Sequence, residues 1–300
     1  MDTLNVSDAC SAVPLVSIGV PVYNGEATLA AALESLVSQS SSDFEIIISD
    51  NASDDRTQEI CREYEERYDN IFYVRQDQNI GATNNFRFVL DRARGQYFMW
   101  AAADDLRSPD FIENNVLFLN DNSDYVASAG PNCFEGCELN KEQWVSFLIK
   151  GDTPSDRFLE FFEYCWKSNG VFYSLIRTEI AKKCWFVGDS FIAADWAFNL
   201  FILTHGKFNR VDRGLTVLGV DGVSNQPNAY RRFRNRKIEI LFPFYQLSVY
   251  VFVWSKKFPA RARILLMSKL LKLNIQAFFN QIYSDLYRFY CGVRSEIFSK

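Results

Sequence analysis

The feature that most constrains the fold is a regular alternation of strand-like and helix-like segments over the first 130 residues. Short apolar runs typical of strands cover Leu15–Val22, Phe44–Ser49, Ile71–Val74 and Tyr97–Ala101. Segments with helical spacing of apolar residues follow them, over Glu26–Ser38, Asp54–Tyr68, Thr83–Ala93 and Pro109–Leu119. This order predicts an α/β fold with a mixed, mostly parallel sheet sandwiched by helices.

Beyond residue 122 the pattern is less regular. Strands are predicted over Val171–Arg177 and Phe208–Leu218, and a helix over Ala193–Leu203. From Ala229 onward the chain is helical in character, with a break at Phe258-Pro259. We therefore expect a tail over residues 1–13, an α/β domain over 14–228 with halves 14–122 and 123–228, and a helical extension over 229–300.

Charge is distributed unevenly along the chain. The net charge is -5, but residues 231–300 contain 14 Lys/Arg and only 3 Asp/Glu, whereas residues 1–230 contain 18 and 34. The basic extension therefore either faces an anionic surface or packs against the acidic body. Its aromatic content argues against a disordered basic arm of the kind that binds nucleic acid.

The polar N-terminal residues predict no signal peptide, and no run of about 18 uncharged apolar residues predicts a transmembrane helix. Seven cysteines without a CxxC pair, together with the single His205, argue against a zinc site. These features are typical of a cytoplasmic protein with reduced thiols.

Ligands of parallel sheets bind at the carboxyl ends of the strands, which singles out the loops Tyr23–Glu26, Asp50–Asp55 and Ala102–Ser108. In the first, Pro21 ends the strand and Tyr23 can stack on a nucleotide base, although an ordinary strand-to-helix turn would look the same. In the second, Asp50 stands at the strand end, where a carboxylate can accept the N3–H of uracil or thymine.

The third loop carries two adjacent carboxylates, Asp104 and Asp105, which repel each other unless they are solvated or neutralised. Mg²⁺ or Mn²⁺ would neutralise them, because these ions take one or two carboxylates together with substrate phosphates. The alternative is a solvated loop whose aspartate caps the next helix.

Taken in order, these loops resemble those of the family 2 glycosyltransferases, which have the GT-A fold. The resemblance covers about residues 14–225 and rests on five pieces in register: Pro21-Val-Tyr-Asn-Gly25, Leu29 to Gln39 with Ser35-Leu36, Asp50-Asn-Ala-Ser-Asp-Asp-Arg-Thr57, Asn79-Ile-Gly81 with Asn85, and Ala103-Asp-Asp105 with Pro109-Asp-Phe-Ile112. It implies an inverting enzyme that uses Mn²⁺ or Mg²⁺ and a nucleotide-diphosphate sugar.

The resemblance also implies roles for single residues. The donor nucleotide would be held by residues of the first half of the domain, namely Pro21, Tyr23, Asn24, Asp50, Asn79, Gly81, Asn85 and Asp104. Asp105, with Asp104, would bind the metal. The chain departs from many relatives at Ala102, where they carry a further aspartate, and this weakens the case for metal dependence.

Inverting transfer needs a general base to deprotonate the acceptor hydroxyl, and the family places an acid about 90 residues beyond the metal motif. Asp195 fits that position, although an acidic residue at a helix start also stabilises the helix itself. Trp196 can pack on a sugar or in the core. Arg177 lies in a segment that resembles the acceptor side, and Arg231 and Arg232 resemble basic residues that reach the diphosphate when a loop closes.

The extension leaves alternatives open. Aromatic residues over 238–254 flanked by basic clusters suit a helix at a membrane interface, which would bring the site to a lipid-linked acceptor, but they also suit packing on the core or a homodimer contact. The expected donor is UDP- or dTDP-linked, and the expected setting is cell-surface polysaccharide or lipopolysaccharide synthesis.

Other classes of protein fit less well. A nicotinamide dehydrogenase would show GxGxxG after the first strand, where this chain reads Val22-Tyr-Asn-Gly-Glu26. A nucleotidyltransferase would show a glycine-rich phosphate loop. A non-catalytic protein that binds nucleotide sugars or glycans remains the alternative, but it would have no use for a general base at Asp195.

Overall fold

The computed structural model describes residues 13–136, 148–167, 171–187, 189–219 and 229–298. Its main sheet has seven strands in the order β3-β2-β1-β4-β8-β6-β9. The strands are β1 (Val16–Val22), β2 (Phe44–Asp50), β3 (Ile71–Arg75), β4 (Tyr97–Trp100), β6 (Tyr125–Ala129), β8 (Leu175–Arg177) and β9 (Lys207–Arg210). All neighbouring strands are parallel except that β8 runs antiparallel to both β4 and β6. The predicted sheet is confirmed.

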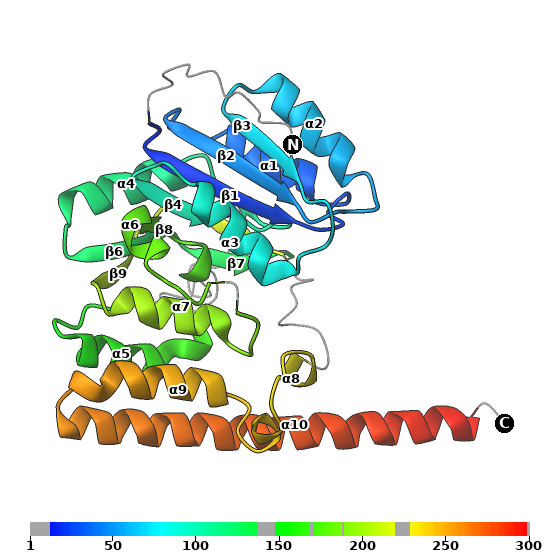
Figure 1. The fold of residues 1–300 in the computed structure, drawn as a ribbon, viewed down its shortest axis with the longest axis vertical. Helices are drawn as coiled ribbons and strands as arrows, with labels where there is room; N and C mark the ends of the chain where they lie inside the picture. The colour runs from blue at the N-terminus through cyan, green and yellow to red at the C-terminus, as the bar shows by residue number, and fades with distance from the viewer. Residues whose placement is uncertain (1–12, 137–147, 168–170, 188, 220–228, 299–300) are drawn as a thin grey trace.

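Helices cover both faces of this sheet (Figure 1). One face packs on α1 (Leu29–Val37), α2 (Thr57–Arg67) and α4 (Phe111–Asp121), whose apolar residues form one core with alternate residues of β1 and β2. The other face packs on α3 (Ala82–Arg92), α6 (Thr178–Lys182) and α7 (Ala194–Leu203) around Phe98 and Trp100, and α5 (Pro154–Tyr164) packs on α7. Strands β1 and β2 are buried along their whole length, as expected of central parallel strands.

A second, three-stranded sheet has the order β5-β10-β7, from β5 (Leu106–Arg107), β7 (Asn132–Phe134) and β10 (Thr216–Leu218). The prediction of one strand over Phe208–Leu218 is therefore wrong. The chain leaves β9 after Arg210 and turns at Gly214, whose φ is +77°. A Cβ at Gly214 would lie 3.0 Å from the Phe111 Cα, so the turn packs directly on α4.

Two other elements differ from prediction. Residues Val171–Tyr173 form a 3₁₀ turn, and only Leu175–Arg177 is a strand. Helix α2 starts three residues later than expected, because Asp55 accepts the Thr57 N–H at 2.9 Å and the loop before the helix is held by its own side chains. The residue before the helix, Arg56, makes no side-chain capping hydrogen bond.

The extension contains α8 (Ala229–Arg232), a 3₁₀ turn (Lys237–Ile240), α9 (Tyr245–Trp254), a second 3₁₀ turn (Ser255–Lys257) and α10 (Ala260–Phe298). Figure 1 shows α5, α7, α9 and α10 layered away from the sheet, with α10 outermost. One face of α10 enters the same core as α5 and α7 through Leu266, Leu270, Leu273 and Ala277. Part of the extension therefore packs on the body.

Within the described residues, no helix is both long enough and apolar enough to cross a membrane. In the same part of the chain, Cys61 and Cys184 are buried free thiols.

Candidate active site

The carboxyl ends of β1, β2 and β4 bring the three predicted loops together at one edge of the sheet. In the parallel register, Val22 lies opposite Asp50, and Ala101, just beyond β4, donates its N–H to the Gly19 carbonyl at 2.9 Å. Pro21 is buried within β1, whereas Tyr23, two residues later, is 50% exposed. The strand therefore presents an accessible aromatic ring at its end.

The first two loops hold each other in place through Asn24. Its φ of +52° lies in the left-handed region, which asparagine tolerates. The Asn24 N–H donates to the Ser53 hydroxyl at 2.9 Å, and its Oδ1 accepts the Asp54 N–H at 3.0 Å. Ala52, with a φ of +61°, takes the same conformation without a side chain that favours it, so the loop stores strain.

Asn79, Gly81 and Asn85 reach the same edge, and their polar groups serve to shape it. Asn79 Oδ1 accepts hydrogen bonds from Asn51 Nδ2 at 3.0 Å and from the Gly81 N–H at 2.9 Å. Asn85 is 2% exposed; its Oδ1 accepts the Ser49 hydroxyl at 2.6 Å and its Nδ2 donates to the Ser49 carbonyl at 2.8 Å. These contacts fix the end of β2 against α3.

Asp50 is fully buried at the end of β2. Its Oδ1 accepts the Ser53 N–H at 2.9 Å, and its Oδ2 accepts hydrogen bonds from Tyr73 Oη at 3.1 Å and Arg75 Nη1 at 3.0 Å. Burial and the neighbouring Asp50 charge raise the pKa of Tyr73, so its hydroxyl stays protonated and donates. A base could contact Asp50 directly only if one of these partners moved.

Arg75 is a site residue that sequence reasoning missed. It is the direct register partner of Asp50 across β2 and β3, and about a third of its side chain is exposed. Its Nη2 also donates to the Ser53 carbonyl at 2.8 Å, so the guanidinium ties the end of β2 to the loop that follows it. The available signal in the sequence was that Arg75 ends the strand that follows the one ending in Asp50.

Asp105 is the buried member of the Asp104–Asp105 pair. It is 4% exposed, and its Oδ1 accepts the Gly219 N–H at 3.1 Å. Its Oδ2 is buried and accepts no hydrogen bond within the described residues. Burial raises the pKa of Asp105 to about 6, against the attraction of Arg107 and the Gly219 N–H.

Asp104 is half-buried and lies against Gly219, where an added Cβ would come within 2.2 Å of its Oδ2. Gly219 therefore contacts both carboxylates: its Cα lies against Asp104, and its N–H donates to Asp105. Only glycine leaves room for this approach.

The residues present fit a divalent cation at this place. Asp105 offers a buried oxygen without a partner, and Asp104 adds a second carboxylate beside it. No group of three or more His, Cys, Asp or Glu side chains that could hold a metal occurs among the described residues, so further ligands would have to come from substrate or water. Phosphate oxygens of a diphosphate are the ligands that such an open site expects.

Two further residues missed by sequence reasoning lie beside the carboxylates. Arg107 is 4% exposed, and its Nη2 donates to the Trp100 carbonyl at 3.2 Å and the Tyr173 carbonyl at 3.4 Å. It thereby ties the end of β4 to the turn that contains Tyr173. Burial, with the charges of Asp105, Asp104 and Asp195, raises the pKa of Tyr173. Tyr173 thus lies close enough to both the Asp104–Asp105 pair and Asp195 for their charges to raise its pKa.

Asp195 stands in the first turn of α7, after Ala193, whose φ of +62° is strained for an alanine. Although part of the Asp195 side chain is exposed, the surrounding protein removes much of its water and raises its pKa. The local N–H groups of the helix start oppose this rise. A solvent-accessible carboxyl with a raised pKa suits a general base in a recess.

The other predicted contacts do not all join this site. Arg177 ends β8, which runs antiparallel to β4, so it lies opposite Tyr97 at the other edge of the sheet. There its guanidinium donates to the carbonyls of Tyr125 at 2.9 Å and Leu119 at 2.7 Å. The structure does not bring Arg177 to the carboxylates.

Trp196 is half-buried and stacks on Phe244 of the extension, with 5.7 Å between ring centroids and 4° between planes. Arg231 and Arg232 are exposed on α8. The loop over residues 220–228, which precedes these arginines, lies outside the described residues.

Comparison with known proteins agrees with this geometry. The model of glycosyl transferase family 2 matches residues 17–184. The chain is 30% identical over 112 residues to the minor teichoic acid biosynthesis protein GgaB of Bacillus subtilis, covering 37% of this chain and 12% of that protein. It spans 36% to 45% of the lengths of three further curated relatives, at 33% to 35% identity.

Two solved structures share the fold. The mannosyltransferase PcManGT from Pyrobaculum calidifontis, in complex with GDP-Man and Mn²⁺, superimposes with a TM-score of 0.60 at 17% identity, covering 94% of this chain and 77% of that one. TarS 1-349 of S. aureus in complex with UDP-GlcNAc gives 0.57 at 16% identity, covering 88% and 83%. The predicted GT-A fold is thereby confirmed.

Proposed function

The chain belongs to glycosyl transferase family 2 and is a transferase, and from this premise we propose that it moves a sugar, with inversion, from a nucleotide-diphosphate donor to a hydroxyl of a glycan or lipid-linked acceptor. We place the reaction in cell-surface polysaccharide or lipopolysaccharide synthesis. Similarity to a teichoic acid biosynthesis protein supports that setting.

The observation that carries the proposal is the buried Asp105 oxygen without a hydrogen-bond partner. A buried unpaired carboxylate oxygen costs stability, so its retention at the sheet edge points to a ligand that completes it. We assign the cation, Mn²⁺ or Mg²⁺, to Asp105 and Asp104. When bound, the cation would stabilise the negative charge of a diphosphate leaving group.

Asp195 is the proposed general base. Its carboxylate takes the proton of the acceptor hydroxyl as that oxygen bonds to the anomeric carbon, while the bond from that carbon to the diphosphate breaks and the electron pair leaves with the nucleotide. Because the attack comes from the side opposite the leaving group, the new linkage has the opposite anomeric configuration. Tyr173, a protonated hydroxyl among the three carboxylates, would face the sugar between them.

The donor is expected to be UDP- or dTDP-linked, as the aspartate at the end of β2 suggests. The burial of Asp50 changes how this selection would work: Asp50 would hold Arg75, and Arg75 with the exposed Tyr23 would meet the base. Among the structural neighbours, one binds UDP-GlcNAc and the other GDP-Man. We assign Pro21, Asn24, Asn79, Gly81 and Asn85 the task of shaping this pocket.

Thermal unfolding against UDP-, dTDP-, GDP- and CMP-sugars, each with and without Mn²⁺, tests the proposal. A ligand that binds only the folded state raises the unfolding temperature by mass action, so one diphosphate sugar should stabilise the protein, and only with Mn²⁺. Asp105→Ala should abolish that shift, while the exposed-residue control Asp77→Asn should keep it. Stabilisation without any donor hydrolysis or transfer would favour the non-catalytic binding protein instead.

The extension carries a second, separable proposal about location. Around the α9–α10 turn, the exposed apolar residues Phe252 and Val253 precede Lys256 and Lys257 in the sequence, and the exposed Ile264 and Leu265 follow them. This combination suits peripheral contact with an anionic membrane on the cytoplasmic side. Co-sedimentation with vesicles that contain anionic lipid tests it, and a homodimer would appear as a doubled mass in light scattering without lipid.

A further inference from the structure

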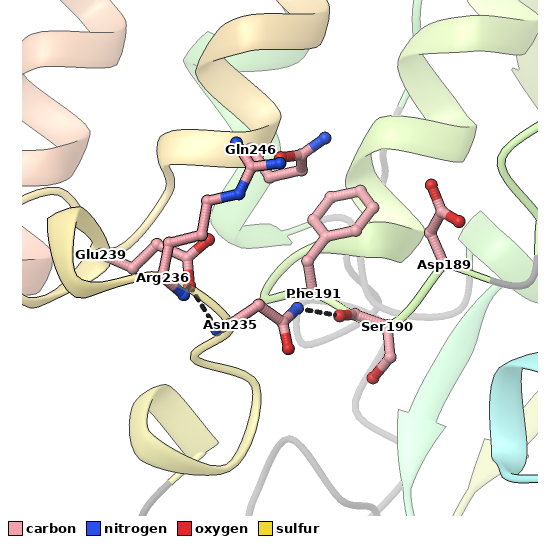
Figure 2. Close-up of a pocket in the computed structure, with 7 residues that line it drawn as sticks. All are labelled: Asp189, Ser190, Phe191, Asn235, Arg236, Glu239 and Gln246. Atoms are coloured by element: carbon pink, nitrogen blue, oxygen red, sulfur yellow. Dashed lines mark hydrogen bonds between the residues drawn. The ribbon is translucent and has the colours of Figure 1, made fainter.

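A small polar pocket lies between the segment that precedes the proposed base and the C-terminal extension (Figure 2). Its volume is about 210 Å³. One wall comes from the loop before α7 and contains Asp189 and Ser190. The other comes from the extension and contains Asn235, Arg236, Glu239 and Gln246.

The pocket is close to the proposed base along the chain. Phe191, which also lines it, precedes Asp195 by four residues, so their Cα atoms are at most about 14 Å apart even in an extended chain. The segment is not extended, because the Ala194 N–H donates to the Phe191 carbonyl at 3.2 Å. A ligand in the pocket is therefore within the span of a short oligosaccharide from Asp195.

Its walls are fixed to each other before any ligand binds. Asn235 Nδ2 donates to the Ser190 carbonyl at 2.5 Å, which ties the extension to the base loop. Glu239 Oε2 accepts the N–H groups of Asn235 at 2.6 Å and Arg236 at 3.0 Å. On the other side, Tyr250 Oη donates to Asp189 Oδ2 at 3.0 Å. The pocket is thus preformed, which lowers the entropic cost of binding.

The groups that remain accessible are suited to hydroxyl-rich ligands. Asp189, Ser190 and Arg236 are exposed, and the Arg236 guanidinium is steadied over the Tyr245 ring at 5.7 Å. Carboxylates, carboxamides and a guanidinium donate and accept paired hydrogen bonds, as neighbouring sugar hydroxyls require. Two carboxylates, Asp189 and Glu239, oppose one guanidinium, so the local charge disfavours phosphate or uronate groups.

We propose that this pocket binds a neutral sugar unit of the acceptor glycan and so positions the acceptor hydroxyl near Asp195. The inference rests on the proposed function but adds a site that the sheet edge does not contain. It also gives the extension a role in recognition, since four of the lining residues belong to it.

The test uses the full chain and two variants in the pocket, Arg236→Gln and Gln246→Ala. The matched control is Arg67→Gln, because Arg67 is also exposed and also lies over a tyrosine ring, Tyr68, at 5.1 Å, but on α2. Binding of the methyl glycosides of glucose, galactose, mannose and N-acetylglucosamine is measured by saturation-transfer NMR, with methyl glucuronide and glucose 6-phosphate as charged probes. The donor-induced rise in unfolding temperature is measured on every protein in parallel.

We expect at least one neutral glycoside to bind the wild type and Arg67→Gln, and its Kd to rise about tenfold or more in both pocket variants, as loss of a charge-assisted or paired hydrogen bond predicts. The donor-induced shift should persist in the variants. Unchanged glycoside binding in both variants, binding of the charged probes alone, or no glycoside binding to the wild type would overturn the inference. Absence of a donor-induced shift in the wild type would instead count against the proposed function.

Discussion

Replacing Gly219 by alanine should disable the carboxylate pair without removing either carboxylate. An added Cβ would lie 2.2 Å from Asp104 Oδ2, 2.5 Å from its Cγ and 2.9 Å from its Cβ. Ordinary contact begins at 3.4 Å, so the carboxylate oxygen must retreat by about 1.2 Å. Rotation of the side chain cannot relieve the contact at Cβ, so the two backbone segments must also separate.

That separation acts on Asp105 as well, because the Gly219 N–H is the donor to its Oδ1 at 3.1 Å. A displacement of this size at a reacting centre costs roughly 10²-fold in rate, whereas strain of this kind costs about 1–3 kcal/mol of stability. We therefore expect Gly219→Ala to stay folded, to lose Mn²⁺-dependent donor stabilisation, and to lose about 10²-fold in kcat/KM.

Two controls make the reasoning testable. Gly136→Ala adds a methyl group that meets no atom within 4 Å, so it should cost backbone strain alone and keep the metal response. In an Asp104→Ala background the contacts with Oδ2 and Cγ are gone and only the 2.9 Å contact with Cβ remains, so Gly219→Ala should add less than it does in the wild type. Wild-type kinetics in Gly219→Ala, or full additivity in the double variant, would refute the proposed packing of Gly219 on the carboxylates.

Three other substitutions probe separate parts of the account. Asp195→Asn should leave donor binding intact while transfer falls by about 10²-fold or more. A base works only when deprotonated, and the pKa of Asp195 is raised above 3.8, so wild-type kcat/KM should begin to fall at a pH above that value as the solution is acidified. An acid limb at or below pH 3.8 would contradict the assignment. Asp50→Asn should weaken the hold on Arg75 and destabilise the fold by about 1–3 kcal/mol in denaturant unfolding, with a raised KM for the donor; an unchanged KM would separate Asp50 from the base pocket. Leu270→Ala should cost about 2–5 kcal/mol, because Leu270 is 3% exposed in the shared core, and a neutral result would mean that α10 does not pack there in solution.

The sequence predicted those parts of the fold that local periodicity determines. Strands β1 to β4 and helices α1 to α4 lie close to where the apolar spacing put them, and the parallel order made their carboxyl ends meet. Asp50, Asp104 and Tyr23 accordingly stand at one edge. These predictions need only the spacing of apolar side chains in each segment and the handedness of the connections between parallel strands.

What could not be predicted depends on contacts distant in sequence. Arg177 was assigned to the site because its segment resembles the acceptor side of the family, but β8 runs antiparallel to β4 and places Arg177 at the other edge of the sheet. Asp50 is bonded to Arg75, and so is not free for a base, because the register of β3 places Arg75 directly opposite it. The unpaired oxygen of Asp105 follows from its burial under Gly219, more than a hundred residues away. Side-chain spacing within a segment carries no information on any of these contacts.

The extension shows the same limit. Its aromatic and basic residues suited a membrane, the body or a second copy equally well in the sequence. Packing of α9 and α10 on α5 and α7 accounts for the buried apolar residues of the extension, including Tyr250, Leu266 and Leu273, and leaves the exposed ones for the contacts proposed above.

The most direct test of the central claim is release of nucleoside diphosphate from a nucleotide sugar by the purified full chain, followed by NMR with Mn²⁺ or with EDTA. We predict release from one donor class in Mn²⁺, at least 10²-fold less in EDTA or in Asp105→Ala, and faster turnover when acceptor is added. Equal release in EDTA, equal release by Asp105→Ala, or no release from any UDP-, dTDP-, GDP- or CMP-sugar would contradict the assignment of the sheet edge as a metal-dependent sugar-transfer site.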